Sequence, residues 1–416
     1  MHGRIVKGFC LVVLIGLLVP LSVFAGGDKE DMILVGAPLP LTGPYASDGE
    51  QMKMALELAI EEKNAAGGLM GKQIKLITGD VGALEPEKIK AVGERLAGQN
   101  VHVALTGYAD SGVDARVFAQ YDMPYIHADA MTEDSLVARK QIEETGTSNL
   151  FQYCPAEVAY GEDAAEYLFK VPGEMGWTAP TKKIAVVKVD YSYNILAADK
   201  FAELSAAKGY EIVVDETIQF GHVEFGPILS KIKDSGASFV TFWDLDPKDA
   251  ANFMKQFYDA FIDKGIQALV YMQFTPVIPE FLDLAGKAAE GLLWSTTVNP
   301  VSDGVAEYDA RWVEKFGSEP ASSYSYGTRD GFDLWVAAVE KVGSVDDFEA
   351  VIEELKKTDY SGLTGRIVFD PEDHTAYAGI DYIPTVWQQV WGGKHNKSFP
   401  TEFAGGYTYK LPPWVK

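Results

Sequence analysis

The N-terminal part of the chain shows a regular change of hydrophobic period along residues 33–77. A short apolar run at 33–35 is typical of a buried strand, and closely spaced glycines and prolines then forbid regular structure over 38–49. Apolar residues recur at helical spacing over 52–60 until a pair of glycines ends the helix. Apolar and polar residues alternate again at 74–78, so this stretch predicts a β-α-β unit.

The same alternation of short strands and amphipathic helices continues along the chain, and it restarts after residue 149. Further strands are expected at 101–106, 124–128, 183–189, 210–216, 238–242, 267–272, 291–295, 364–369 and 380–390. Further helices are expected near 86–98, 112–121, 158–170, 194–207, 224–235, 248–262, 305–316, 324–342 and 346–357. Two successive sets of alternating elements predict an α/β protein with two parallel-sheet lobes.

Loops at the carboxyl ends of the strands are the candidate binding edge, because ligands of open parallel sheets bind there. The first such loop, 39–49, contains Tyr45, and the loop after strand 101–106 contains Tyr108 and Ser111. A serine at a strand-to-helix turn can cap the helix or offer its hydroxyl to an anion, and the residues alone leave both roles open.

The motifs LTGPYASDG (residues 41–49) and NAAGGLMGKQIKL (residues 64–76) resemble the opening of type I periplasmic solute-binding proteins. Within that group the chain is most similar to the branched-chain amino acid (Leu/Ile/Val) binding proteins of ABC transporters. The resemblance implies two doubly wound parallel-sheet lobes joined by three hinge crossovers, here near Gln152, Thr297 and Ala378. Lobe I would then comprise residues 26–152 and 298–378, and lobe II residues 153–297 and 379–416.

Residues 1–25 read as a signal peptide that directs export to the periplasm. A basic start is followed by an apolar run over 9–23, shorter than a membrane-spanning helix, and by a small-residue cleavage site at Ala25. Cleavage removes Arg4 and Lys7, so the formal charge moves from −24 to −26. A mature chain this acidic repels nucleic acid and anionic membrane surfaces, and no other segment is apolar enough to span a membrane.

The sequence offers no signature of catalysis, of a cofactor or of a metal site. Residues 67–72 superficially suggest a phosphate loop, but the glycines are too close together and the run follows a helix. Neither a GxGxxG run after a strand nor a GxSxG elbow is present, and the histidines are far apart in sequence. Only Cys154 survives cleavage, which excludes an intrachain disulfide. We therefore expect a binding protein, not an enzyme.

The resemblance assigns roles to several loop residues. In relatives, a serine at the position of Ser111 binds the ligand carboxylate, and the loop at Asp129, Ala130 and Met131 offers backbone groups and a threonine hydroxyl; here Met131 stands at the threonine position. Aromatic residues at strand ends suit a small amphipathic ligand, although each could instead belong to the core. The residues expected to contact ligand are Tyr45, Tyr108, Ser111, Asp129, Ala130, Met131, Tyr153, Tyr191, Tyr193, Asp244, Phe274 and Tyr326.

One departure from the relatives concerns the ligand's amine. Amino-acid-binding relatives place a glutamate after the strand that corresponds to 267–272, whereas this chain has Gln273 and Phe274. A buried ammonium without a carboxylate is costly, so either Asp244 or Asp129 replaces the glutamate, or the ligand has no amine.

The resulting expectation is a binding subunit of an ABC importer. It would capture a small amino acid-like, carboxylate or amide solute between its lobes and deliver it to permease subunits. A periplasmic ligand sensor of a signalling system is the alternative, and an exported enzyme is the third reading.

Overall fold

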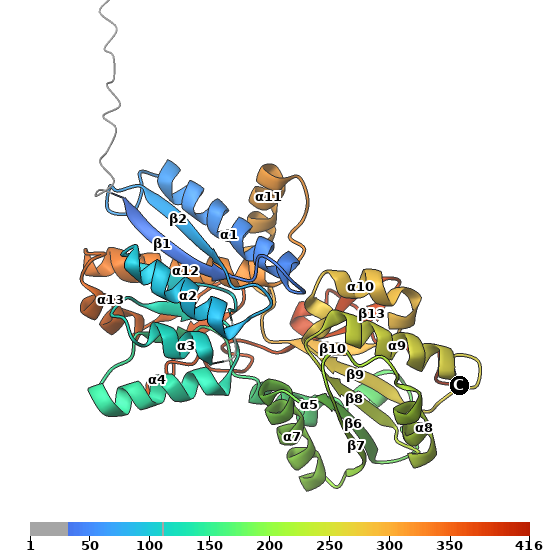
Figure 1. Cartoon of the computed structure of the whole chain (residues 1–416). Helices are drawn as coiled ribbons and strands as arrows, with labels where there is room; N and C mark the ends of the chain where they lie inside the picture. The colour runs from blue at the N-terminus through green and yellow to red at the C-terminus, as the bar shows by residue number, and fades with distance from the viewer. Residues whose placement is uncertain (1–31, 110–111) are drawn as a thin grey trace, which may run out of the picture.

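The computed structural model describes residues 32–109 and 112–416, which form two lobes side by side (Figure 1). A five-stranded, fully parallel sheet in the order β2-β1-β3-β4-β5 forms the centre of the first lobe. Its strands are β1 (Ile33–Leu39), β2 (Ile74–Asp80), β3 (Val103–Leu105), β4 (Tyr125–His127) and β5 (Leu150–Gln152). The expected α/β class with parallel sheets is thus confirmed.

Helices from two distant parts of the sequence surround this first sheet (Figure 1). The N-terminal group is α1 (Ala46–Ala65), α2 (Pro86–Gly98), α3 (Val113–Phe118) and α4 (Thr132–Thr145). The later group is α11 (Val305–Phe316), α12 (Tyr324–Val342) and α13 (Phe348–Leu355), followed by the hairpin of β11 (Asp359–Ser361) and β12 (Arg366–Val368). Helix α12 packs directly against α1, which brings these two parts of the chain together.

A seven-stranded sheet in the order β14-β13-β10-β9-β8-β6-β7 forms the second lobe. Five strands are parallel, whereas β13 pairs antiparallel with β10, and β14 pairs antiparallel with β13. The strands are β6 (Lys183–Val189), β7 (Glu211–Ile218), β8 (Phe239–Trp243), β9 (Leu269–Gln273), β10 (Leu293–Thr296), β13 (Val386–Trp391) and β14 (Lys394–Phe399).

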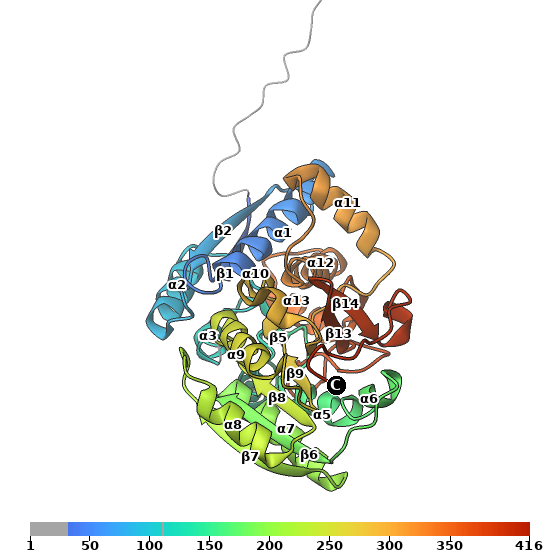
Figure 2. The same ribbon diagram turned by 90° about the vertical axis from the view of Figure 1, so that its right-hand side faces the viewer.

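The helices of the second lobe lie around this sheet, as the two views of the chain show (Figures 1 and 2). They are α5 (Val158–Tyr167), α6 (Val171–Glu174), α7 (Ser192–Ala207), α8 (Gly226–Ser235), α9 (Pro247–Phe261) and α10 (Glu280–Ala285). Short 3₁₀ turns complete the chain at η2 (Thr275–Val277), η3 (Gly286–Ala289) and η4 (Thr401–Phe403). Within the described residues, no helix combines the length and the apolar character that crossing a membrane requires.

The central strands are mostly apolar because helices cover both faces of each sheet. Every residue of β8 and β9 is buried, and so is every residue of β3 and β4. At the sheet edges the pattern changes, because β7 exposes Glu211 and Asp215 to solvent. The largest hydrophobic cluster contains residues of both lobes.

Some elements differ from the expectation drawn from the sequence. Helix α4 was not expected, because its face carries few apolar residues and its buried positions include Asp134 and Ser135. The short strand β5 was assigned to a crossover. No strand was expected after residue 390, but β14 forms there, since a polar strand can pair along the edge of a sheet.

We predict that Gly161→Ala destabilises the second lobe, although alanine normally favours a helix. A β-carbon at this position of α5 would lie 2.3 Å from the carbonyl oxygen of Ala197 in α7, so the two helices would have to move apart. The expected loss is about 1–3 kcal/mol in urea unfolding. The control is Gly226→Ala in α8, where a β-carbon meets nothing within 4 Å. Equal stability of both variants would contradict this packing.

Candidate functional site

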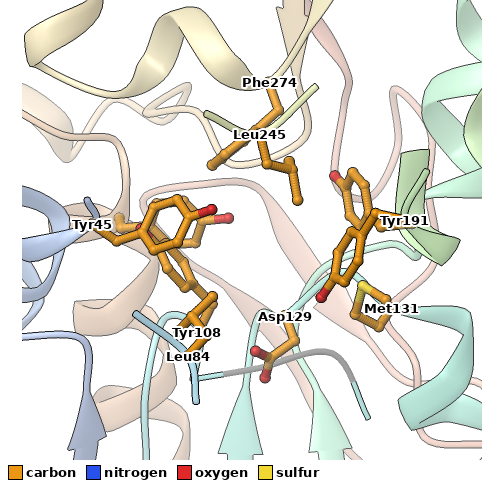
Figure 3. Close-up of a pocket in the computed structure, with 10 residues that line it drawn as sticks. Tyr45, Leu84, Tyr108, Asp129, Met131, Tyr191, Leu245 and Phe274 are labelled. Carbon is orange, nitrogen blue, oxygen red and sulfur yellow. The ribbon is translucent and has the colours of Figure 1, made fainter. Parts of the chain in front are cut away.

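A cavity lies between the two lobes, and aromatic side chains form most of its wall (Figure 3). The space between its walls is about 450 Å³, part of it open to solvent. The lining residues are Tyr45, Leu84, Tyr108, Asp129, Met131, Tyr191, Tyr193, Leu245, Phe274 and Tyr324.

The first lobe supplies its lining residues mainly from loops that follow parallel strands. Tyr45 follows β1, Leu84 follows β2 and Tyr108 follows β3. Asp129 and Met131 follow β4. These residues meet because the carboxyl ends of parallel strands lie along one edge of the sheet.

The second lobe contributes in the same way from the opposite side. Tyr191 follows β6, Leu245 follows β8 and Phe274 follows β9, while Tyr193 lies in the first turn of α7. In the close-up, Phe274 and Leu245 lie across the cavity from Tyr108 and Asp129 (Figure 3). The cavity is therefore built from the strand ends of both sheets.

Ring contacts join the aromatic residues into one surface. The rings of Tyr108 and Tyr324 are 4.8 Å apart, edge to face, and Tyr45 meets Tyr108 at 6.0 Å. Phe274 of the second lobe meets Tyr324 of the first at 6.0 Å. Such pairs hold their geometry well, so the wall offers fixed apolar area with hydroxyls at its edges.

Tyr108 is held by a buried carboxyl group. Its hydroxyl donates a 2.9 Å hydrogen bond to Oδ2 of Asp48, which is completely buried in α1. Burial raises the pKa of the Asp48 carboxyl to about 6, although hydrogen bonds from Ser322 and Tyr108 act in the opposite direction. The orientation of Tyr108 is thus fixed from behind the cavity wall.

Asp129 is the one charged side chain among the described residues that line the cavity. Its Oδ1 accepts a 2.8 Å hydrogen bond from the backbone N–H of Ala109, and its Oδ2 lies 2.7 Å from Nδ1 of His127. The residue is 7 % exposed and its side chain is fully buried, so a ligand ammonium that met it would be largely desolvated together with it. This carboxylate is the natural partner for a cationic group inside the cavity.

Three residues at or next to the cavity have a positive φ. The angle is 62° at Leu84, 57° at Ala130 and 53° at Phe274, which is uncommon for residues other than glycine and most unusual for a bulky one. Hydrogen bonds hold Phe274 in place: its N–H donates to Ser295 and its carbonyl accepts from Val277. Backbone strain of this kind gathers at functional sites, where the surrounding structure maintains it.

Hydrogen bonds also connect the two lobes beside the cavity. The hydroxyl of Ser47 in α1 donates to Oε2 of Glu280 in α10 at 2.7 Å. The backbone N–H and the hydroxyl of Thr132 both donate to Oε2 of Glu157, at 2.6 and 2.8 Å. The lobes are therefore in contact around the cavity, as in a closed binding protein.

Four of the expected contact residues lie away from the cavity wall. Tyr326 is two positions beyond Tyr324 on α12, so it faces another side of the helix and donates to Asp309. Tyr153 donates to the carbonyl of Thr106 in the core of the first lobe. Asp244 is fully buried, and its Oδ1 accepts from the N–H of Asp246. Ala130 contributes backbone beside the wall but does not line it.

Ser111 lies outside the described residues, so its assigned contact with a carboxylate stays a prediction. The hydroxyl of Thr132, the residue after Met131, donates to Glu157. Gln273, at the position of the relatives' glutamate, is fully buried and donates to the carbonyl of Asp244.

Three lining residues were missed by sequence reasoning. Leu84 and Leu245 follow strands as the other lining residues do, but the search favoured polar and aromatic side chains. Tyr324 stands in a stretch with two tyrosines, and only the rotation of α12 decides which one faces the cavity.

The family model described as "Periplasmic binding protein" matches residues 33–382, most of the chain. The chain belongs to this family. Its members are the binding proteins of transport systems and act outside the cytoplasm. Capture of a solute is therefore the function that both the cavity and the family support.

Relatives and solved structures agree with this membership over nearly the whole chain. "Leu/Ile/Val-binding protein homolog 2" of Brucella abortus is 27% identical, with 94% of this chain and 97% of the relative covered. A crystal structure of an ABC transporter protein from Silicibacter pomeroyi has a TM-score of 0.81 at 23% identity, covering 92% and 100% of the two chains. A solute-binding protein of an ABC transporter from Rhodopseudomonas palustris, crystallised with 3,4-dihydroxybenzoic acid, has a TM-score of 0.68 at 23% identity, with 92% and 96% covered. These structures share the fold.

We predict that Asp48 makes stability depend on pH. Because the pKa of this carboxyl is about 6 in the folded protein, above its ordinary value of 3.8, folding holds the proton more tightly than the unfolded chain does. The resulting stabilisation is fully present below about pH 4 and is lost as pH rises through about 6. At about pH 4, Asp48→Asn removes this stabilisation, whereas at about pH 7.5 there is none left to remove. The change in the free energy of unfolding should therefore be about 2–3 kcal/mol less destabilising at about pH 7.5 than at about pH 4.

Urea unfolding of wild type and variant at both pH values measures this difference. The exposed Asp381 provides the control, since Asp381→Asn should have the same effect at both pH values. An equally constant effect of Asp48→Asn would show that the buried carboxyl does not couple folding to protons.

Proposed function

We propose that this protein is the extracytoplasmic solute-binding subunit of an ABC importer. The observation that carries the proposal is the aromatic cavity at which the strand ends of both lobes meet. A solute bound there is desolvated from two sides, and the closed protein is the form that docks on the permease. Export to the periplasm, with cleavage near Ala25, is part of this proposal.

The chemistry of the wall supports a small solute with an apolar or aromatic group. Tyrosine rings, Leu84, Leu245 and Phe274 offer mostly apolar surface, and the hydroxyls provide a few polar contacts. The Brucella relative is named as a Leu/Ile/Val-binding protein, and the Rhodopseudomonas structure contains an aromatic acid. Both kinds of ligand are small and carry one carboxylate beside an apolar body.

Asp129 favours a solute that also carries an ammonium group. Two aspartates were candidates to replace the relatives' glutamate. Asp244 is fully buried and is not among the lining residues, whereas Asp129 lines the cavity. A carboxylate in this wall stabilises an ammonium and repels an acid that lacks one. We therefore propose a small apolar or aromatic amino acid in preference to a deaminated acid.

Closure requires hinges, and we propose that they lie near Gln152, Thr297 and Ala378. The chain leaves the first sheet after β5, leaves the second after β10 and returns to it before β13. Gln152 exchanges backbone hydrogen bonds with His374 and Ala376, so two of these crossings lie side by side. Lobes I (26–152 and 298–378) and II (153–297 and 379–416) would move about this line.

Transport is favoured over the alternative of a sensor by the transporter relatives, and over an enzyme because a binding family needs no chemical step. Genes for a permease and an ATPase beside this gene would support transport, whereas a neighbouring gene for a histidine kinase would support a sensor.

We predict that the protein binds leucine, isoleucine, valine or phenylalanine at one site, and that their deaminated acids bind more weakly. Titration calorimetry with each amino acid and its keto or deaminated acid measures this preference. Asp129→Asn should weaken amino acid binding by about tenfold or more, since a charged partner contributes roughly 1.5–3 kcal/mol. The same variant should bind the deaminated acids no worse than wild type.

Asp244→Asn is the matched control, because it removes an acid that does not reach the cavity wall. Loss of amino acid binding in this variant alone would make Asp244 the ammonium partner. Tighter binding of the deaminated acids by wild type would overturn the amino acid proposal, and binding of neither class would contradict the assigned solute.

A further inference from the structure

A second group of polar side chains is buried directly behind Asp129. Asp114 in α3, His127 at the end of β4, Asp129 and Asp134 in α4 each place one oxygen or nitrogen atom within 4.8 Å of all the others. None of these side chains is more than 7 % exposed. They come from three segments that meet beneath the cavity.

One member of this cluster carries an atom without a hydrogen-bond partner. Oδ1 of the fully buried Asp114 accepts no hydrogen bond among the described residues, while its Oδ2 accepts from the hydroxyl of Tyr125. Nδ1 of His127, which is 1 % exposed, is paired with Oδ2 of Asp129 at 2.7 Å. A buried polar atom without a partner is rare in proteins and calls for one.

Three buried carboxyl groups surround the imidazole of His127 in a space that solvent hardly reaches. Buried carboxylates are costly unless a group of opposite charge accompanies them, and a metal cation is such a group.

We propose that Asp114, His127, Asp129 and Asp134 bind one divalent metal ion beneath the solute cavity. The largest separation of 4.8 Å is about twice the usual metal–ligand distance of roughly 2.0–2.6 Å, so one central ion can reach all four after small shifts. The ion supplies positive charge among the carboxylates and a partner for Oδ1 of Asp114.

The donor set selects the kind of ion. Carboxylates suit Mg²⁺, Ca²⁺ and Mn²⁺, whereas imidazole suits transition metals such as Zn²⁺. Ca²⁺ and Mg²⁺ prefer oxygen ligands throughout, so the nitrogen of His127 favours Mn²⁺ or Zn²⁺. Because Asp129 belongs to both sites, the ion would also hold the loop that follows β4 against α3 and α4.

The proposed site departs from the expectation of no metal site, which rested on the wide spacing of histidines. A single histidine is enough here, because the carboxylates come from three separate elements that only the fold unites.

The test uses the tag-free mature chain, stripped with a chelator and dialysed. Titration calorimetry with Mn²⁺ and with Zn²⁺ should show one ion per chain, with weaker binding of Ca²⁺ and Mg²⁺. Asp114→Asn keeps the shape of the side chain and an oxygen for the Tyr125 hydroxyl. It should nevertheless lower the affinity for the preferred ion by about tenfold or more, because removing a metal ligand costs more affinity than removing a residue that only supports a ligand. Asp163→Asn, in the second lobe, is the matched control and should bind the ion as wild type does.

A second measurement decides the question should the Asp114→Asn variant fold poorly. Pulsed electron paramagnetic resonance of Mn²⁺ bound to wild type should show coupling to an imidazole nitrogen, and His127→Phe, which preserves stacking on Tyr125, should remove it. Absence of stoichiometric binding, absence of the nitrogen coupling, or equal affinity in a folded Asp114→Asn variant would overturn the site. Solute binding is measured in its own titration, so failure of the metal site is distinguishable from failure of the proposed transport function.

Discussion

The direction of parallel strands is the constraint on which this structure depends. All strands of one parallel set end at the same edge, so the loops that follow them must gather there. In this protein the edges of two sheets face each other, and Tyr108, Asp129, Tyr191 and Phe274 meet although they are far apart in sequence. The cavity is therefore a consequence of topology, and the side chains at the strand ends set its chemistry.

Most of the fold, and the place of the site, could be predicted because they follow from local patterns. Apolar runs and helical spacing identify β6, β8 and α12, and the strand-end rule leads to Tyr45 and Tyr191. What could not be predicted depends on rotation or distant pairing. Whether Tyr324 or Tyr326 faces the cavity is decided by the packing of α12, and β14 exists only because β13 pairs with it.

Buried carboxyl groups lie behind the wall of this cavity, which is therefore more than a set of aromatic rings. Asp48 fixes Tyr108 from one side, and Asp129 connects the wall with His127 on the other. Each buried charge costs stability unless a proton or a cation accompanies it. Both lie in the lobe that holds most of the cavity: Asp48 orients Tyr108, and Asp129 is the one acidic residue that lines the cavity among the described residues.

The central claim is that a solute closes the two lobes around this cavity, and small-angle X-ray scattering tests it most directly. The structure has the lobes in contact through Ser47 and Glu280, and through Thr132 and Glu157. Solute-free protein should have a larger radius of gyration than this closed form, and saturation with the solute found by calorimetry should reduce it. An unchanged radius of gyration at saturating solute would contradict closure by hinge motion.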